Sequence, residues 1–201
     1  MIKYLFADRD GTLILDKHYL SDPAQVELFP GVSNSLKLLR DNAIKIFVVT
    51  NQSGIGRGYF SENDFFACQE ALKQLLLEKG VEISDYAFCP HAPEEECSCR
   101  KPALGMWEYL SQKHGICADE CAMVGDKMED VVFGIKAGFA LSCLVLTGKG
   151  EQTARKFHLQ KKGEPTGFSS EVFGIKQEKT KCYLVSALSS LSDFIIKDSR
   201  D

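Results

Sequence analysis

The chain has 201 residues, of which 44% are hydrophobic, and its formal net charge is −4. This length and composition suit one globular domain with a substantial core and exclude a disordered chain. The negative charge argues against a nucleic-acid partner, and no apolar run approaches the ~20 residues that span a bilayer. The N-terminus lacks the zones of a signal peptide. We therefore expect a cytoplasmic monomer, one domain over residues 1–201, and neither a nucleic-acid nor a membrane partner.

Short apolar runs alternate with longer stretches of helical periodicity along the chain. The predicted strands are residues 4–7, 46–49, 86–88, 122–124, 143–146 and 183–185, and the predicted helices are 31–42, 61–79, 104–113, 128–137 and 189–196. This alternation predicts an α/β fold with a doubly wound, Rossmann-like parallel sheet, in which ligands bind beyond the carboxyl ends of the strands. The connections leave no room for a large cap domain.

The segment from about residue 148 to 181 interrupts this pattern. It carries eight basic and four acidic residues and little periodicity. We expect an irregular, solvated surface excursion there, with a binding patch as the alternative.

The eight cysteines fall into two groups. The length of the chain and the missing signal peptide argue against a disulfide framework. Three cysteines lie close to His91, in Cys89-Pro90-His91 and Cys97-Ser98-Cys99. Three thiolates and one imidazole form a complete tetrahedral zinc set, so we expect a structural zinc loop over residues 89–99. The others are expected to be ordinary buried thiols: Cys68, Cys117, Cys121, Cys143 and Cys182.

Two acidic residues, Asp8 and Asp10, follow the first predicted strand. One carboxylate could attack phosphorus while the other transfers protons, and Gly11 allows the backbone to turn close to a ligand. Read alone, the segment also fits an ordinary turn.

Three further polar segments could serve phosphate chemistry. Thr50 to Gly54 follows the second strong strand, and its hydroxyl and backbone N–H groups could hold phosphate oxygens. Arg100 and Lys101 could neutralise a phosphoryl group in transfer. Asp126, at another strand end, could bind Mg²⁺ through oxygen, with Asp130 one helical turn later. A polar turn, a surface basic pair and an acidic helix N-terminus are the respective alternatives.

The order of these four segments resembles the haloacid dehalogenase superfamily of phosphotransferases. The superfamily motifs are an Asp-x-Asp-x-Thr strand end, a Thr or Ser strand end, a Lys and an acidic Mg²⁺ site. All four are present here, between residue 4 and about residue 147.

The resemblance implies a role for each matched position. Asp8 would be the nucleophile that forms an aspartyl-phosphate, and Asp10 would be the general acid and base. Mg²⁺ would lie between Asp8, the carbonyl of Asp10 and Asp126. Thr50 and Lys101 would hold the transferring phosphoryl group, and Asp130 would support this site.

The zinc loop beside Arg100-Lys101-Pro102 resembles two related phosphatase groups, which act on D-glycero-D-manno-heptose 1,7-bisphosphate or on histidinol phosphate. The stretch from Gln52 to Phe60 favours the first, and the shortness of the zinc loop favours the second. A sugar bisphosphate also explains surplus cations, because its second phosphate needs them. A polynucleotide 3′-phosphatase and a non-enzymatic zinc-stabilised module are further alternatives. The expected substrate-binding residues are Asp16, Tyr19, Asn51, Gln52, Ser53, Arg57, Arg100 and Lys127.

Overall fold

The computed structural model describes residues 1–176 and 179–198. Its centre is a seven-stranded sheet in the order β3-β2-β1-β4-β5-β7-β6. All neighbouring strands are parallel except β6, which is antiparallel to β7. The strands are β1 (Tyr4–Ala7), β2 (Lys45–Asn51), β3 (Asp85–Cys89), β4 (Cys121–Gly125), β5 (Leu141–Val145), β6 (Thr166–Phe168) and β7 (Lys181–Val185). The predicted doubly wound α/β fold is confirmed.

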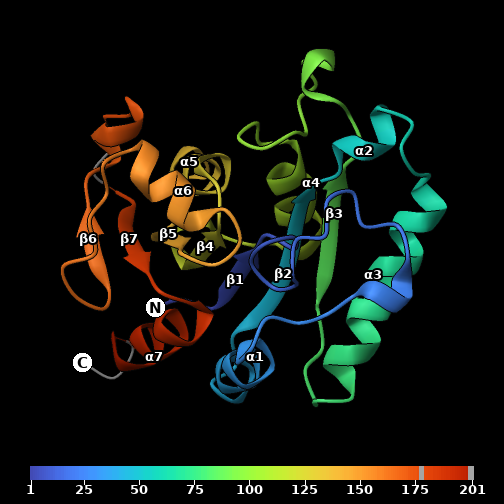
Figure 1. The fold of residues 1–201 in the computed structure, drawn as a ribbon. Helices are drawn as coiled ribbons and strands as arrows, with labels where there is room; N and C mark the ends of the chain where they lie inside the picture. Colours follow the sequence, from blue (N-terminus) through green and yellow to red (C-terminus); the bar gives the residue numbers. More distant parts are fainter. Residues whose placement is uncertain (177–178, 199–201) are drawn as a thin grey trace.

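Helices cover both faces of this sheet (Figure 1). On one face lie α1 (Val32–Asp41), α3 (Glu62–Leu77) and α7 (Leu188–Asp198). On the other lie α4 (Gly105–His114), α5 (Met128–Ala137) and α6 (Gly150–Lys156). The short helix α2 (Ser53–Gly56) follows β2. The 3-10 turns are η1 (Pro23–Gln25), η2 (Pro93–Glu95), η3 (Ala118–Glu120) and η4 (Ser170–Phe173).

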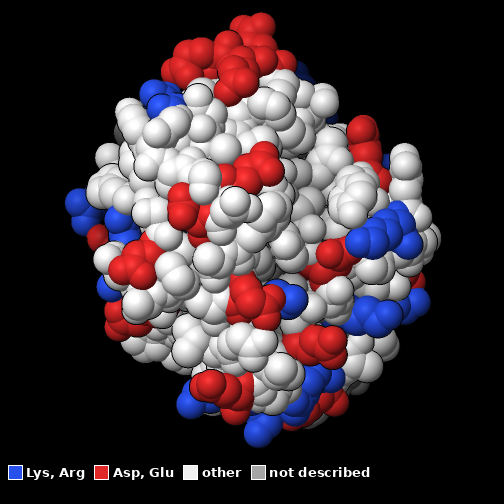
Figure 2. Space-filling model, turned by 90° about the vertical axis from the view of Figure 1, so that its right-hand side faces the viewer, with Lys and Arg blue, Asp and Glu red and all other residues white. Residues whose placement is uncertain are grey.

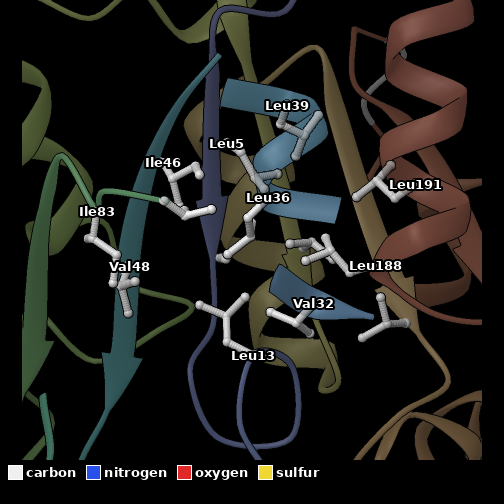
Figure 3. Close-up of a cluster of buried hydrophobic side chains, with 14 of the residues drawn as sticks. Leu5, Leu13, Val32, Leu36, Leu39, Ile46, Val48, Ile83, Leu188 and Leu191 are labelled. Carbon is white, nitrogen blue, oxygen red and sulfur yellow. The ribbon is translucent and has the colours of Figure 1, made fainter. Parts of the chain in front are cut away.

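The larger core lies between the sheet and α1, α3 and α7. Leu36 and Leu39 of α1 meet Leu5 of β1 and Leu191 of α7 in this cluster (Figure 3). A helix with apolar residues at this spacing buries one stripe, as the sequence predicted. On the opposite face, Phe6, Phe47, Phe133 and Phe139 form an aromatic core with α4 and α5. Both layers bury side chains of β1, which lies between β2 and β4 inside the sheet.

The sequence prediction is wrong in part for residues 148–181, which are not simply irregular. This segment contains α6, β6 and η4, and Ala154, Phe168 and Phe173 pack into a third apolar cluster. A seven-residue helix and a three-residue strand are too short to show a clear period, and β6 depends on pairing with β7. Contacts with distant segments, rather than a local sequence pattern, therefore determine where these elements form.

Two smaller expectations can be compared with the structure. The helix predicted over residues 61–79 is α3, and Ser61 caps it, because the Ser61 hydroxyl accepts a hydrogen bond from the backbone N–H of Asp64. Cys117, by contrast, is exposed rather than buried, since it precedes η3 at the surface. Among the described residues, no helix is both long enough and apolar enough to cross a membrane.

Candidate active site

The carboxyl ends of three neighbouring strands bring the predicted acidic and polar residues together. In the register of the sheet, Ala7 of β1 lies opposite Val48 of β2 and Val124 of β4. The next residues along these strands therefore converge at one edge, as in other doubly wound sheets. A cavity of about 380 Å³ opens there, and its lining includes Asp8, Asp10, Thr50, Lys101 and Asp130.

A buried ammonium group bridges two of the carboxylates. Lys101 Nζ lies 2.7 Å from Asp8 Oδ1, 2.6 Å from Asp130 Oδ1 and 2.6 Å from the carbonyl oxygen of Val49. Burial alone would lower the pKa of Lys101, but the Asp130 and Asp8 carboxylates outweigh burial and raise it. Burial opposes ionisation of Asp8 too, yet Lys101 and Lys127 lower the pKa of its carboxyl. Both shifts favour the ion pair between the Asp8 carboxylate and the Lys101 ammonium group.

Two carboxylate oxygens at this edge have no hydrogen-bond donor among the described residues, Asp8 Oδ2 and Asp126 Oδ1. Lys127 Nζ is 3.5 Å from Asp126 Oδ1, an ion-pair distance. Burial, followed by the charge of Asp8, raises the pKa of Asp126 to about 7. Buried oxygens without donors are uncommon and suit a bound cation. Hard oxygen ligands of this kind fit Mg²⁺.

Asp130 is less suited to be a ligand, although its carboxylate lies within 4.8 Å of those of Asp8 and Asp126. Its Oδ1 pairs with Lys101, and its Oδ2 accepts a hydrogen bond of 3.0 Å from the backbone N–H of Lys127. Both oxygens are thus occupied. Asp130 therefore remains a candidate for the supporting role that the sequence predicts.

The backbone packs closely around Asp126. Gly11 has a φ of +90°, and a Cβ on this residue would lie 2.2 Å from Asp126 Oδ2. Gly148 approaches the same oxygen from the loop after β5, where a Cβ would lie 2.4 Å away. In addition, the backbone N–H of Lys149 donates to Asp126 Oδ2 at 2.8 Å. Only glycine fits at these two positions without displacing the carboxylate.

The Asp10 carboxylate is held by two side chains. Gln52 Nε2 donates to Asp10 Oδ2 at 2.8 Å and to Thr50 Oγ1 at 2.8 Å. Arg9 donates to the same carboxylate through Nε at 3.0 Å and through Nη2 at 3.3 Å. The side chain of Asp10 remains 20% exposed, toward the cavity that it lines.

Asn51 lines the cavity and also fixes the backbone at Lys101. Its Oδ1 accepts from Lys101 N–H at 2.9 Å, and its Nδ2 donates to the Lys101 carbonyl at 3.1 Å. This pair of bonds orders the loop that carries the buried ammonium. Arg100 and Ser53 also line the cavity.

Most of the predicted substrate-binding residues lie at the cavity, with one exception. Asp16, Tyr19, Asn51, Gln52, Ser53, Arg100 and Lys127 line it. Arg57 is not in this lining, because its guanidinium pairs with Glu94 of the next loop at 3.0 Å. Tyr19 contacts Tyr59 edge to face, with ring centroids 4.6 Å apart.

Sequence reasoning missed several residues at this site. The motifs assign no role to Arg9, although a basic residue between two acids can form an ion pair with either. Lys149 was counted among the solvated charges of the excursion, yet it lines the cavity, and its Nζ lies 3.8 Å from Asp16 Oδ2. His18 and Glu129 also line the cavity and carried no recognisable signal.

The cysteines near His91 form a compact cluster at the end of β3. Cys89 Sγ lies 3.4 Å from Cys97 Sγ and 3.5 Å from His91 Nδ1. Cys99 Sγ lies 3.2 Å from His91 Nδ1 and 3.5 Å from Cys97 Sγ. Zinc bonds of about 2.3 Å to sulfur and about 2.0 Å to nitrogen separate tetrahedral ligands by roughly 3.5–3.8 Å, so this donor set fits the ion.

The loop that carries this cluster has an acidic outer surface. Glu94, Glu95 and Glu96 are exposed next to one another. Figure 2 shows acidic side chains gathered at the top of the molecule, where η2 lies in Figure 1. Cys89 is buried and Cys97 and Cys99 are half-buried, whereas these carboxylates are exposed to solvent.

The chain is similar to several known phosphatases. A family model described as HAD-hydrolase-like matches residues 98–168. A heptose-1,7-bisphosphate 7-phosphatase of Haemophilus influenzae is 39% identical over 155 residues, which cover 74% of this chain and 84% of that protein. One from Helicobacter pylori strain J99 is 40% identical over 136 residues, covering 67% of this chain and 78% of that protein. A solved D,D-heptose 1,7-bisphosphate phosphatase from B. bronchiseptica, complexed with magnesium and phosphate, has a TM-score of 0.81 at 25% identity and covers 98% of this chain. The match covers 99% of that solved chain.

The fold and these likenesses define a hydrolase of the phosphatase class. The chain belongs to the haloacid dehalogenase-like (HAD) family, to which its order of motifs had pointed.

Proposed function

We propose that this phosphatase is a Mg²⁺-dependent phosphomonoester hydrolase that acts through an aspartyl-phosphate on Asp8. The observation that carries the proposal is the environment of Asp8. One of its oxygens pairs with the buried Lys101, and the other has no donor among the described residues. An ionised carboxylate that lines a cavity and has one oxygen free of hydrogen bonds is suited to nucleophilic attack.

Two proton transfers belong to Asp10 in this proposal. Asp8 attacks phosphorus, the bond from phosphorus to the leaving oxygen breaks, and Asp10 gives that oxygen its proton. Asp10 then takes a proton from water, which attacks the aspartyl-phosphate and releases phosphate and free Asp8. Thr50 and Lys101 hold the phosphoryl oxygens during both steps, because preorganised donors stabilise the charge in the transition state.

The residues that would hold Mg²⁺ are Asp8 and Asp126 through their carboxylates and Asp10 through its backbone carbonyl. A bound Mg²⁺ would neutralise charge on the phosphoryl oxygens. The two carboxylate oxygens without donors support this assignment.

The second metal in the proposal is structural Zn²⁺ at Cys89, His91, Cys97 and Cys99. All four ligand atoms lie within 4.8 Å of one another, and a full set of four leaves no open position for chemistry. Zinc would order the loop that leads directly to Arg100 and Lys101.

The substrate that we propose is D-glycero-D-manno-heptose 1,7-bisphosphate, with removal of the 7-phosphate, in the cytoplasmic synthesis of surface-glycan precursors by a monomeric enzyme. The names of the relatives support this choice. Three further cations beside Lys101, namely Arg100, Lys127 and Lys149, line the cavity. A second phosphate on the same molecule would use them, whereas histidinol phosphate brings its own positive charge.

A phosphate-release assay across three substrates tests the proposal. We expect heptose 1,7-bisphosphate to have a higher kcat/KM than histidinol phosphate and a 3′-phosphorylated oligonucleotide. A preference for histidinol phosphate would indicate a role in histidine biosynthesis instead. A preference for the oligonucleotide would indicate an enzyme that acts on nucleic acid.

A further inference from the structure

Arg9 is the largest fully buried side chain of the protein among the described residues, with 1% of its surface exposed. It lies in sequence between the two carboxylates of the Asp8 motif, and the proposed function gives it no part. A buried guanidinium is costly unless its charge is paired and its donors are used. The question is therefore what its burial achieves.

The guanidinium is directed at Asp10 rather than at Asp8. Arg9 Nε lies 3.0 Å from Asp10 Oδ2, and Arg9 Nη2 lies 3.3 Å from Asp10 Oδ1. Two parallel N–H···O bonds fix the plane of a carboxylate as well as its position. A Lys in the same place could offer a charge but not this fork.

An aromatic ring fixes the other face of the guanidinium. The Arg9 Cζ atom lies 5.0 Å from the centroid of the Phe65 ring, within the range of a cation–π contact. Phe65 is fully buried on α3 and stacks on Phe88 of β3, with centroids 4.3 Å apart. The fork is thus held by the packing between α3 and the sheet.

The two oxygens of Asp10 differ as a consequence. Oδ2 accepts from both Arg9 Nε and Gln52 Nε2, which uses its two lone pairs. Oδ1 accepts only the longer bond from Arg9 Nη2 among the hydrogen bonds of the described residues. Oδ1 therefore keeps one lone pair for proton exchange.

We propose that Arg9 is a positioning residue that, backed by Phe65, locks the Asp10 carboxyl so that Oδ1 exchanges the proton of the leaving group. This inference rests on the proposed role of Asp10 in proton transfer. It assigns to Arg9 an effect on one chemical step, which a merely structural residue would not have.

The test compares two substrates that differ in their leaving groups. Phenyl phosphate needs a proton on its departing oxygen, whereas 2,4-dinitrophenyl phosphate does not. The measured quantity is kcat/KM, which reports the steps through formation of the aspartyl-phosphate. The variants are Arg9→Met, which keeps a long buried side chain without donors, and Arg9→Lys.

For Arg9→Met we expect kcat/KM with phenyl phosphate to fall about 10- to 100-fold, part of the ~10²- to 10⁴-fold that general acid catalysis contributes. The loss with 2,4-dinitrophenyl phosphate should stay below about 3-fold, and Arg9→Lys should fall between the wild type and Arg9→Met. Equal losses on both substrates, or no loss on either, would overturn the proposal.

A matched control is available in Arg40, which pairs with the next residue, Asp41, through Nε at 3.0 Å on the exposed side of α1. Arg40→Met should leave kcat/KM unchanged for both substrates. If Arg9→Met does not fold, Phe65→Leu decides, because it removes the ring beneath the guanidinium and keeps an apolar side chain. It should give a smaller loss confined to phenyl phosphate, and a loss shared by both substrates contradicts the inference.

The variant Asp10→Asn distinguishes an error in the proposed role of Asp10 from an error in the inferred role of Arg9. If this variant shows no selective loss with phenyl phosphate, the proposed role of Asp10 is wrong, and the role of Arg9 falls with it. If Asp10→Asn shows the selective loss and Arg9→Met does not, only the inference about Arg9 is wrong.

Discussion

Two clusters of metal-type ligands lie at the same edge of the sheet, and they differ in completeness. The Cys89, His91, Cys97 and Cys99 cluster offers four donors within 4.8 Å, the number that a tetrahedral ion needs. The carboxylate centre around Asp8 and Asp126 instead has two oxygens without donors and a cavity in front of them. A complete set favours a structural ion, and an incomplete one leaves positions for a substrate. We therefore propose that the carboxylate cluster carries the chemistry and that the cysteine cluster orders its loop.

Removal of the proposed nucleophile should have the greatest effect on the carboxylate cluster. Asp8→Asn keeps the shape of the side chain and its neighbours but cannot form the aspartyl-phosphate. We expect kcat to fall by at least about 10³-fold with any substrate, because covalent catalysis is lost outright. Steady-state phosphate release measures this. Circular dichroism should show an intact fold, and activity above a few per cent of the wild type would contradict covalent catalysis by Asp8.

Magnesium removal is the next largest expected effect. Treatment with EDTA should reduce activity to background, and Mg²⁺ should restore it whereas Zn²⁺ should not. The reason is that the open centre offers carboxylate and carbonyl oxygens, which suit a hard cation. Full activity after exhaustive chelation, verified by elemental analysis, would show that the donor-free oxygens of Asp8 and Asp126 serve another purpose.

The zinc cluster should respond to mutation through stability rather than chemistry. Cys97→Ser removes one thiolate of the complete set, and we expect the protein to lose most of its roughly one equivalent of zinc. Metal binding in such a site is coupled to local folding. The variant should therefore melt at a lower temperature while Asp8 keeps its environment. Elemental analysis and thermal denaturation measure the two effects, and an unchanged melting temperature with full activity would remove the structural role.

The placement of the carboxylate cluster could be predicted from sequence because its residues follow strong local signals. Asp8 and Asp126 each follow a short, fully apolar strand, so the parallel sheet alone brings their carboxylates to one edge. The thiol spacing around His91 likewise needs no tertiary information. Long periodic helices such as α3 were predictable for the same reason.

The parts that escaped prediction depend on contacts between distant segments. Lys149 reaches the cavity because the loop after β5 packs against Gly11, with the Thr147 hydroxyl donating to the Gly11 carbonyl at 2.8 Å. No local pattern announces such a contact. For Arg57 the prediction and the structure differ. The stretch from Gln52 to Phe60 predicts Arg57 as a substrate-binding residue, whereas its guanidinium pairs with Glu94 in the loop of the cysteine cluster. β6 also exists only through its pairing with β7.

Two cations, Lys149 near the carboxylate cluster and Arg57 near the cysteine cluster, should differ in their effect on kcat/KM, although both effects are small. Lys149 is anchored to the carboxylate centre through its backbone, whereas Arg57 is paired with the zinc loop. Lys149→Met should lower kcat/KM for heptose 1,7-bisphosphate about 10-fold, since a hydrogen bond to a charged group contributes about 1.5–3 kcal/mol. Arg57→Met should lower it by no more than about 2-fold, because an exposed ion pair contributes little.

The same two variants with p-nitrophenyl phosphate provide the control. This substrate has one phosphate, which the Asp8 centre already serves, so both variants should hydrolyse it at close to the wild-type kcat/KM. If Lys149→Met loses activity equally on both substrates, Lys149 acts on the reacting phosphate or on Asp126 instead of a remote one. If Arg57→Met shows the larger and selective loss, the guanidinium leaves Glu94 when the substrate binds, and Arg57 is a substrate-binding residue as the sequence predicts.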